Sequence, residues 1–203
     1  MSKDRTIIRQ PVVVVLGHVD SGKTSLLDKI RGTAVQAREV GGITQHIGAS
    51  YFPAETLKEI CGPLLNSLGG GEIRVPGLLV IDTPGHEIFT NLRTRGGSAA
   101  DISILVIDVQ KGLEQQTYES LEILKNRKVP FVVALNKVDT VSGWRKGKSK
   151  FITQSIKEQQ KSVIDILDEK IYNVVGGLSR IGFNSEALYR VRDFTKEIAI
   201  IPV

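Results

Sequence analysis

Residues 17–24 have the types and spacing of a phosphate-binding loop, because they fit the pattern G-x-x-x-x-G-K-S/T. Glycines let the backbone curl so that successive N–H groups face phosphate oxygens, and the N-terminus of a following helix adds partial positive charge. In such a loop Lys23 reaches the β- and γ-phosphates, and the Thr24 hydroxyl ligates Mg²⁺. A simple tight turn, which is the alternative, needs glycine but not a Gly-Lys-Thr triplet. The motif predicts these nucleotide-binding residues: Asp20, Ser21, Gly22, Lys23, Thr24 and Ser25.

A second group of candidate residues, 82–86, directly follows the apolar run Leu78–Ile81. An Asp at the end of a buried parallel strand lies at the carboxyl edge of the sheet, where ligands bind in such folds. We expect Asp82 to hold Mg²⁺ through a water molecule, and Gly85 to bring its backbone N–H to a γ-phosphate oxygen. His86 is the candidate for orienting an attacking water, since orientation and charge stabilisation dominate phosphoryl transfer. The alternatives are a helix N-cap for Asp82 and an ordinary surface histidine for His86.

The segment Asn136–Asp139 has the composition of a base-reading loop, and it follows the apolar run Phe131–Leu135 at another carboxyl edge. Guanine presents two donors on one side, its N1–H and its 2-amino group. One carboxylate accepts both, so Asp139 predicts a preference for guanine over adenine. Asn136 either reaches N7 of the base or ties loops together, and the aliphatic stem of Lys137 can cover the ring face. A polar loop is the alternative for this short pattern alone, but its place after the other two motifs favours a nucleotide site.

Short apolar runs rich in Val and Ile recur along the chain without alternating with polar residues. This pattern is typical of strands buried on both faces, as in a parallel sheet covered by helices. Helical patterns lie between the runs, so the sequence predicts an α/β fold of the P-loop NTPase class, with a doubly wound, mostly parallel sheet and flanking helices. The predicted strands are Val12–Leu16, Leu78–Ile81, Ile102–Val109, Phe131–Leu135 and Ile198–Ile201, and the predicted helices are Lys23–Ile30, Gln115–Lys125 and Ser155–Val175.

Some segments do not fit this scaffold. Thr33–Ser50 is rich in glycine and has few apolar anchors, which predicts a mobile loop, and Leu57–Ile73 predicts a surface excursion. Residues 140–195 predict a helical insertion within a single GTP-binding domain that spans 1–203. Inside the insertion, the basic cluster Arg145–Lys150 predicts either a contact with RNA phosphates or a solvated loop.

Composition and charge exclude several classes of protein. The chain of 203 residues has one cysteine, Cys61, which excludes an internal disulfide and a cysteine-based metal cluster. No apolar run approaches the roughly 18 residues that span a bilayer, and the N-terminus lacks the apolar core of a signal peptide. The net charge of +5 modestly favours a polyanionic partner. These features predict a cytoplasmic protein with no membrane partner.

The three motifs together resemble those of translational GTPases, the family of elongation factor Tu and its relatives. His86, which follows Asp-Thr-Pro-Gly, separates this family from Ras-like proteins, which carry Gln there. The segment Gly41–Ala49 resembles the first switch of the initiation-factor branch, which implies that Thr44 binds Mg²⁺. The resemblance also implies that Val19 and Ile43 flank His86.

The same resemblance implies a role for Asp20, which matches a carboxylate that helps to bind a monovalent cation, K⁺ or Na⁺, near the phosphates. The catalytic residues expected on these grounds are His86, Lys23, Asp20, Val19 and Ile43, and the expected Mg²⁺ ligands are Thr24, Thr44 and Asp82.

A narrower resemblance is to the archaeal and eukaryotic initiation factor 5B branch, which is related to bacterial initiation factor 2. It rests on Glu59–Gly62, Arg93–Gly97 and Ser142–Arg145 together with the long insertion, and it covers nearly the whole chain. Ser21 stands where elongation factors often have His, which we interpret as a subfamily difference. The family's fifth nucleotide motif and the final helix would follow Val203, so we expect the domain to be incomplete at its C-terminus.

The resemblance implies a Mg²⁺-dependent GTPase switch of translation initiation that promotes joining of the ribosomal subunits with initiator tRNA. Hydrolysis would be stimulated by the RNA of the large ribosomal subunit, and domains outside this chain would bind the tRNA. The implied state is a cytoplasmic monomer. The alternatives are another translational GTPase of the elongation or release factor type, a GTP-binding scaffold with little turnover, and a P-loop ATPase or kinase.

Overall fold

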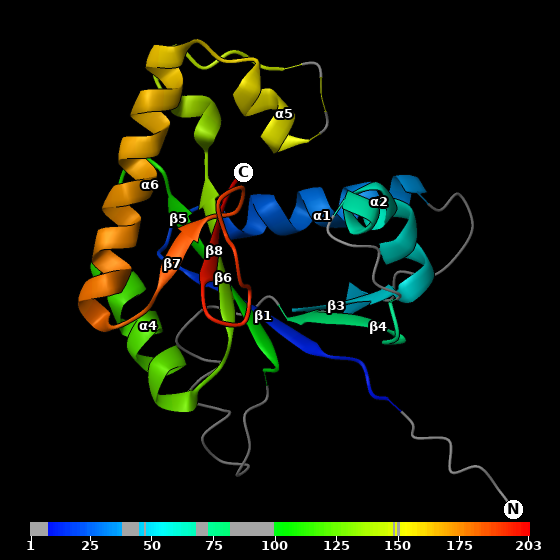
Figure 1. The fold of residues 1–203 in the computed structure, drawn as a ribbon. Helices are drawn as coiled ribbons and strands as arrows, with labels where there is room; N and C mark the ends of the chain where they lie inside the picture. Colours follow the sequence, from blue (N-terminus) through cyan, green and yellow to red (C-terminus); the bar gives the residue numbers. More distant parts are fainter. Residues whose placement is uncertain are drawn as a thin grey trace, which may run out of the picture. The chain divides into compact units, whose positions relative to one another are not determined.

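The computed structural model describes residues 8–37, 45, 46, 48–67, 73–81, 100–147, 149 and 151–203. The chain forms two compact units, the first made of Met1–Val15 and Thr24–Ile102 and the second of Leu16–Lys23 and Ser103–Val203. Strand β1 (Val12–Gly17) has its last two residues in the second unit, and helix α1 (Lys23–Ala37) has only Lys23 there. Figure 1 shows both elements. The predicted phosphate-binding loop lies between them in the chain.

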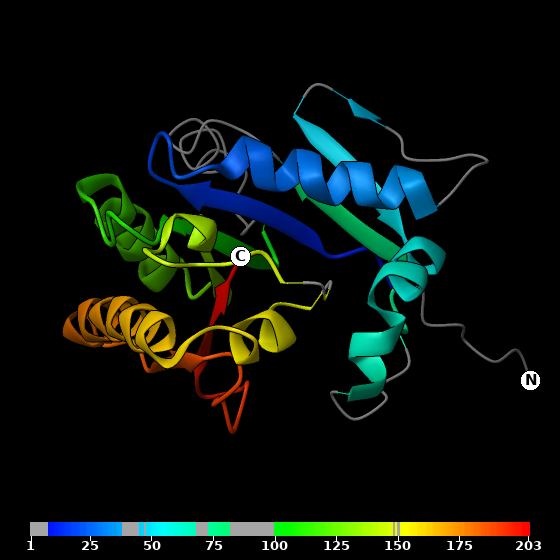
Figure 2. The same ribbon diagram turned by 90° about the horizontal axis from the view of Figure 1, so that it is seen from above.

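The described part of the first unit contains strands in the order β2-β3-β4-β1. Strand β1 runs parallel to β4, with Val12 opposite Leu79, whereas β3 runs antiparallel to both β2 and β4. Helix α1 lies across one face of these strands in both views (Figures 1 and 2). The bounds of the other elements are β2 Gln45–His46, β3 Ala49–Pro53, α2 Ala54–Ser67 and β4 Gly77–Ile81.

The expectation of a loop over the whole of Thr33–Ser50 is wrong. Residues 33–37 form the last turns of α1, and β2 and the start of β3 follow, while residues 38–44 and 47 lie outside the described residues. Strand β3 lacks an apolar run because one of its buried positions is Ser50, whose hydroxyl accepts a hydrogen bond from Arg31 Nε at 2.8 Å. The expected surface excursion from Leu57 begins inside helix α2, which the sequence pattern did not predict.

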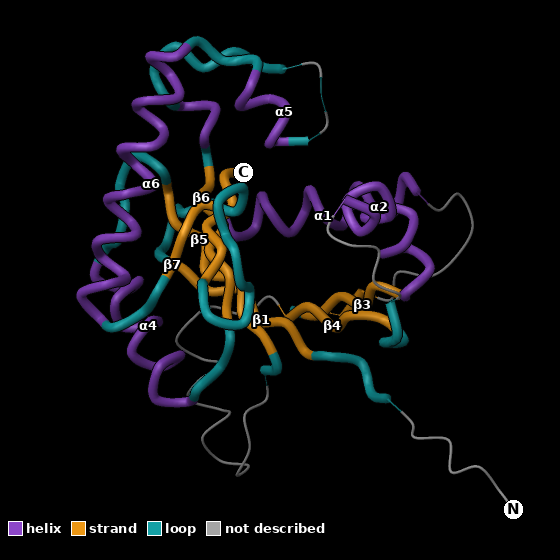
Figure 3. The backbone as a smooth tube through the Cα atoms, in the orientation of Figure 1, coloured by secondary structure: helices purple, strands orange, loops and turns teal. Residues whose placement is uncertain are grey.

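In the second unit the strands follow in the order β5-β6-β8-β7, and every neighbouring pair is parallel. Figure 3 shows helices beside these strands. All the apolar runs predicted as strands are strands in the structure, whereas the short strand β7 was not predicted. The bounds are β5 Ile102–Asp108, α4 Gln115–Arg127, β6 Phe131–Asn136, the 3₁₀ helix η2 Val138–Thr140, β7 Ser185–Ala187 and β8 Ile198–Pro202.

Strands β5 and β6 are buried on both faces. The consecutive residues 105–107 are at most 1% exposed, and residues 133–135 are at most 5% exposed. Since successive side chains of a strand point to opposite faces, such runs need cover on both sides of the sheet. The polar residues Asp108 and Asn136 lie at the carboxyl ends of these strands, opposite each other in register.

The predicted helix Ser155–Val175 is two helices in the structure, α5 (Ile152–Lys157) and α6 (Lys161–Ile181). Between them lies Gln159, whose buried side-chain amide donates to the carbonyl oxygens of Arg145 at 2.7 Å and Ser155 at 2.9 Å. Its Oε1 accepts the backbone N–H of Arg145 at 2.8 Å. These hydrogen bonds hold the loop at Arg145 against the helices. The spacing of apolar residues could not predict them, because they are made by polar groups. Among the described helices, none combines the length and the apolar character needed to cross a membrane.

A substitution at Leu167 tests how much helix α6 contributes to the stability of the second unit. Its side chain is 0% exposed, so we expect Leu167→Ala to reduce the free energy of unfolding by about 2–5 kcal/mol in urea denaturation. The matched control is Glu169→Ala, an exposed position on the same helix, which should change it by less than about 0.5 kcal/mol. Equal effects of the two substitutions would contradict a core role for α6.

Candidate nucleotide-binding site

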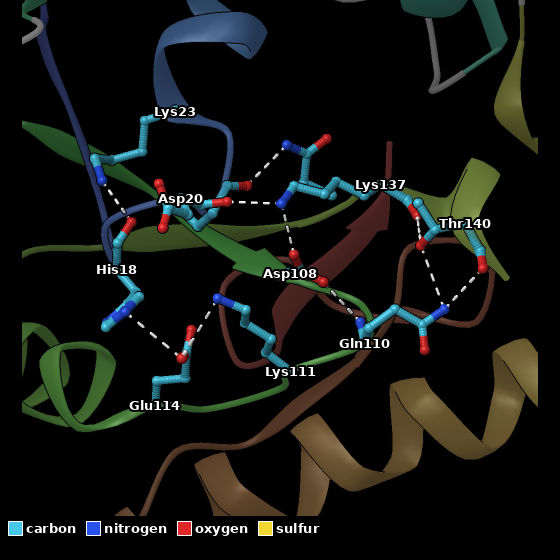
Figure 4. Close-up of polar contacts among 11 residues, drawn as sticks. His18, Asp20, Lys23, Asp108, Gln110, Lys111, Glu114, Lys137 and Thr140 are labelled. Carbon is cyan, nitrogen blue, oxygen red and sulfur yellow. Dashed lines mark hydrogen bonds and ion pairs between the residues drawn. The ribbon is translucent and has the colours of Figure 1, made fainter.

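Three stretches of polar residues meet in the second unit: the loop 17–23, the end of β5 and the end of β6 (Figure 4). The loop follows the last residues of β1, Asp108 ends β5, and Asn136 ends β6. In the close-up, Lys137 reaches between the Asp108 side chain and the backbone of Asp20. The predicted phosphate-binding loop and the predicted base-reading segment are therefore direct neighbours.

Two glycines of the loop allow this close approach. Gly22 has a φ of +89°, and a Cβ at this position would lie 2.3 Å from Nδ2 of Asn136. Gly17 has a φ of +144°, and its Cβ would lie 2.3 Å from the carbonyl oxygen of Val106. A side chain at Gly17 would collide with the backbone of β5, and one at Gly22 would displace the Asn136 side chain that holds the loop.

Inside the loop, the ammonium group of Lys23 is held by the loop's own backbone. Its Nζ donates to the carbonyl oxygens of Gly17 at 3.0 Å and His18 at 2.6 Å. Ser21 is 1% exposed, and its hydroxyl has no hydrogen-bond partner among the described residues. A buried hydroxyl of this kind needs a partner, which a bound phosphate or a water would supply. The loop therefore offers a cation, a buried hydroxyl and a helix N-terminus to an anion.

The base-reading segment is joined to the loop by two side chains. Asn136 Nδ2 donates to the carbonyl oxygen of Ser21 at 2.9 Å, and Lys137 Nζ donates to that of Asp20 at 2.7 Å. Asn136 thus ties the loops together, which is one of the two roles that its type predicted. Asp139 is exposed in η2 and has no hydrogen bond or ion pair with any described residue, so its carboxylate is available to a ligand.

Asp108 is the buried charge of the site. Its carboxylate lies 2.7 Å from Lys137 Nζ and accepts the backbone N–H of Gln110 at 2.8 Å. Burial opposes its ionisation, but these hydrogen bonds outweigh that cost, so the pKa of the Asp108 carboxyl lies below its usual value. The hydrogen bond to Asp108 raises the pKa of Lys137 in turn. Both groups are charged at neutral pH.

The start of helix α4 supports the loop from another side. Gln116 Oε1 accepts the backbone N–H of Val19 at 3.1 Å, and Glu114 Oε1 lies 3.5 Å from Nε2 of His18. The side chain of Val19 itself is 58% exposed. The backbone of the loop is therefore held by α4 at Val19 and by the base-reading segment at Asp20 and Ser21.

The remaining predicted site residues divide into two groups. Thr24 and Ser25 are exposed residues in the first turn of α1, directly after Lys23 in the chain. The other group lies outside the described residues: Ile43, Thr44, Asp82, Gly85 and His86.

The predicted donors for Mg²⁺ are of the right chemical kind. They are a hydroxyl from Thr24, a hydroxyl from Thr44 and a carboxylate from Asp82, and hard oxygen ligands suit this cation, which nucleotide phosphates also coordinate. Within the described ranges, no cluster of three His, Cys, Asp or Glu side chains could hold a metal by itself.

Sequence reasoning missed several residues that shape the site. Asp108 could have been found by the rule that identified Asp82, because it also ends a buried parallel strand at the carboxyl edge. Gln116 carries no such signal, since its role depends on where α4 begins. The missed residues are Asp108, Gln110, Glu114, Gln116 and Thr140, the last of which accepts a hydrogen bond from Gln110 Nε2 through its carbonyl oxygen at 2.9 Å.

Comparisons with known proteins agree with this geometry. A family model described as "Elongation factor Tu GTP binding domain" matches residues 9–197. A probable translation initiation factor IF-2 of Methanopyrus kandleri is 58% identical over 202 residues, which are 100% of this chain and 34% of that protein. The protein of the same name in Sulfolobus acidocaldarius is 56% identical over 196 residues, covering 97% of this chain and 32% of that protein.

The fold is also found among solved structures. The crystal structure of GDP-bound aIF5B from Aeropyrum pernix matches with a TM-score of 0.89 and 52% identity, covering 97% of this chain and 33% of that chain. The mostly parallel sheet, its flanking helices and the loop after β1 define a P-loop GTPase fold. The chain belongs to the translational GTPase family, and it is similar to archaeal initiation factors named IF-2 or aIF5B. It spans about a third of the length of these relatives.

Gly22 provides a test of the close approach between the two loops. In Gly22→Ala the new methyl group would collide with Asn136, so we expect the affinity for GDP, measured by calorimetry, to fall about tenfold or more. The matched control is Gly112→Ala, because Gly112 also has a left-handed φ of +68° but a Cβ there would meet no atom within 4 Å. That variant should keep its GDP affinity. Equal losses in both would mean that backbone strain, and not the contact with Asn136, explains the effect.

Proposed function

We propose that this chain is the domain that binds and hydrolyses GTP in a translation initiation factor. One observation carries the proposal: the phosphate-binding loop and the base-reading segment hydrogen bond directly to each other within one unit. The contacts are those from Asn136 to the carbonyl of Ser21 and from Lys137 to the carbonyl of Asp20. A nucleotide is recognised at its phosphates and at its base, and these contacts couple the two halves of such a site.

The exposed carboxylate of Asp139 supports guanine as the base. It has no partner among the described residues, and it would accept hydrogen bonds from N1–H and from the 2-amino group. Adenine lacks this pair of donors. The site therefore favours GTP over ATP, which argues against a P-loop ATPase or kinase.

For hydrolysis, we propose that a water attacks the γ-phosphate in line. Bound Mg²⁺ would offset the charge of the β- and γ-phosphates, with Thr24, Thr44 and Asp82 holding it. Lys23 would leave its backbone acceptors to bind the phosphates, and Gly85 would donate its N–H to the γ-phosphate. His86, flanked by Val19 and Ile43, would orient the water, and Asp20 would help to hold a monovalent cation.

The partners follow from the initiation factors to which the chain is similar. We propose that the longer protein acts on the ribosome, joins its subunits with initiator tRNA bound, and hydrolyses GTP when the large subunit stimulates it. The γ-phosphate would hold the stretch between α1 and β2 and residues 84–97 until hydrolysis releases them, as in other GTPase switches. The initiator tRNA would be bound outside this chain, and the site of action would be the cytoplasm.

Asp139→Asn tests the choice of base. An amide offers a donor where guanine needs an acceptor, so the affinity for GTP should fall about 30- to 100-fold while that for xanthosine triphosphate rises. Competition against a fluorescent nucleotide measures both. Asp165→Asn, at an exposed position of α6, is the matched control and should bind both nucleotides as the unaltered chain does. An unchanged preference for guanine in Asp139→Asn would refute the assignment of Asp139.

His86→Ala tests the proposed orientation of water. Loss of one orienting group should slow single-turnover GTP hydrolysis about 100-fold or more, while the affinity for GTP changes little. The assay is run on the longer protein with and without ribosomes. Near-normal turnover of the variant would rule out this role. If the unaltered protein shows no hydrolysis under either condition, the scaffold alternative is favoured instead.

A further inference from the structure

We propose that Asp108 is a positioning residue of the nucleotide site, which holds Lys137 so that this lysine fixes the backbone of the phosphate-binding loop at Asp20. The proposal rests on the proposed function, because it assumes that the site binds GTP and GDP. It adds a residue that none of the three sequence motifs contains.

The first observation is the environment of Asp108. Its side chain is 6% exposed at the end of β5, and each of its carboxylate oxygens has a partner. Oδ1 accepts the backbone N–H of Gln110 at 2.8 Å, and Oδ2 lies 2.7 Å from Lys137 Nζ. A buried carboxylate with both oxygens satisfied has one low-energy orientation, so it offers Lys137 a fixed point.

The second observation is that Lys137 uses its ammonium group to bridge two segments. One hydrogen bond goes to Asp108 and a second, of 2.7 Å, goes to the carbonyl oxygen of Asp20 (Figure 4). Lys137 is also held in the left-handed region, with a φ of +64°. That backbone conformation is unfavourable for a residue with a side chain, and it persists only where surrounding contacts determine it.

The third observation concerns Asp20, the residue of the phosphate-binding loop that Lys137 contacts. Asp20 is likewise in the left-handed region, with a φ of +67°. Since a peptide group is planar, holding the Asp20 carbonyl oxygen fixes the orientation of the whole peptide between Asp20 and Ser21. The loop binds phosphates through its backbone N–H groups, so the orientation of this peptide bears on phosphate affinity.

Together these contacts form a chain from β5 through the base-reading segment to the phosphate-binding loop. Without the Asp108 charge, the flexible stem of Lys137 is free to follow water, and the Asp20 carbonyl loses its fixed donor. The loop would then sample conformations that release the phosphates. We expect the change to appear in the rate of nucleotide release more than in the rate of association.

The test uses the 203-residue chain and a fluorescent GDP analogue, with stopped-flow measurement of association and dissociation. Asp108→Asn keeps the shape of the side chain and an acceptor for the Gln110 N–H but removes the charge. We expect its dissociation rate to rise about 10- to 100-fold, with an association rate within about threefold of the unaltered chain. An unchanged dissociation rate would overturn the proposal.

A matched control comes from the other end of β5. Asp101 precedes this strand and is paired with Arg9 at 2.5 Å, so Asp101→Asn also removes an ion-paired carboxylate. Its nucleotide kinetics should remain those of the unaltered chain. If Asp101→Asn speeds release as much as Asp108→Asn does, the effect is one of general stability, and the proposal is wrong.

A double-mutant cycle separates positioning from a merely structural role. If Asp108 acts through Lys137, then Asp108→Asn should have little further effect on GDP release in the Lys137→Met background. Effects that multiply in the double variant would overturn the proposal. The double variant also leaves no unpaired charge, so it provides the comparison if circular dichroism shows that a single variant does not fold.

The same measurements distinguish failure of the proposed function from failure of this inference. Failure of the unaltered chain to bind GDP would refute the proposed function itself. Tight GDP binding by the unaltered chain, with unchanged release in Asp108→Asn, would refute only the role of Asp108.

Discussion

The burial of β5 and β6 on both faces is the constraint on which the site depends. Most side chains inside these strands are apolar, with Ser103 near the start of β5 as a small exception, and the charged and amide side chains stand at the carboxyl ends. Because the strands are parallel and in register, their carboxyl ends lie side by side, with Asp108 opposite Asn136. The requirement for a dry core thus gathers the polar groups of the site at one edge.

At that edge, most of the connections run from side chains to backbone. Asn136, Lys137 and Gln116 each bond to a backbone atom of the phosphate-binding loop. Such contacts fix the shape of a loop without depending on the side chains that the loop itself carries. The loop also lies so close to its neighbours that a Cβ would collide with the Val106 backbone at Gly17 and with the Asn136 side chain at Gly22.

Much of the scaffold could be predicted, because the strands β1, β4, β5, β6 and β8 are continuous apolar runs. Strand β3 could not, since its buried face includes Ser50, which is satisfied by Arg31 from a distant part of the chain. The break between α5 and α6 was missed for a similar reason. It is stabilised by hydrogen bonds between the Gln159 side chain and the backbone of Arg145. Such polar contacts produce no periodic pattern in the sequence, so they could not be predicted from it.

The sequence by itself determined which chemical groups the site contains, because the loop 17–24 and the segment Asn136–Asp139 are local patterns with local geometry. Tertiary structure alone decided that these two segments touch, and that Asp108 and Gln116 support them. The physical reason is that a hydrogen bond between residues more than a hundred positions apart, such as that from Lys137 to Asp20, depends on strand order and register. Strand order and register cannot be inferred from any short segment of the sequence.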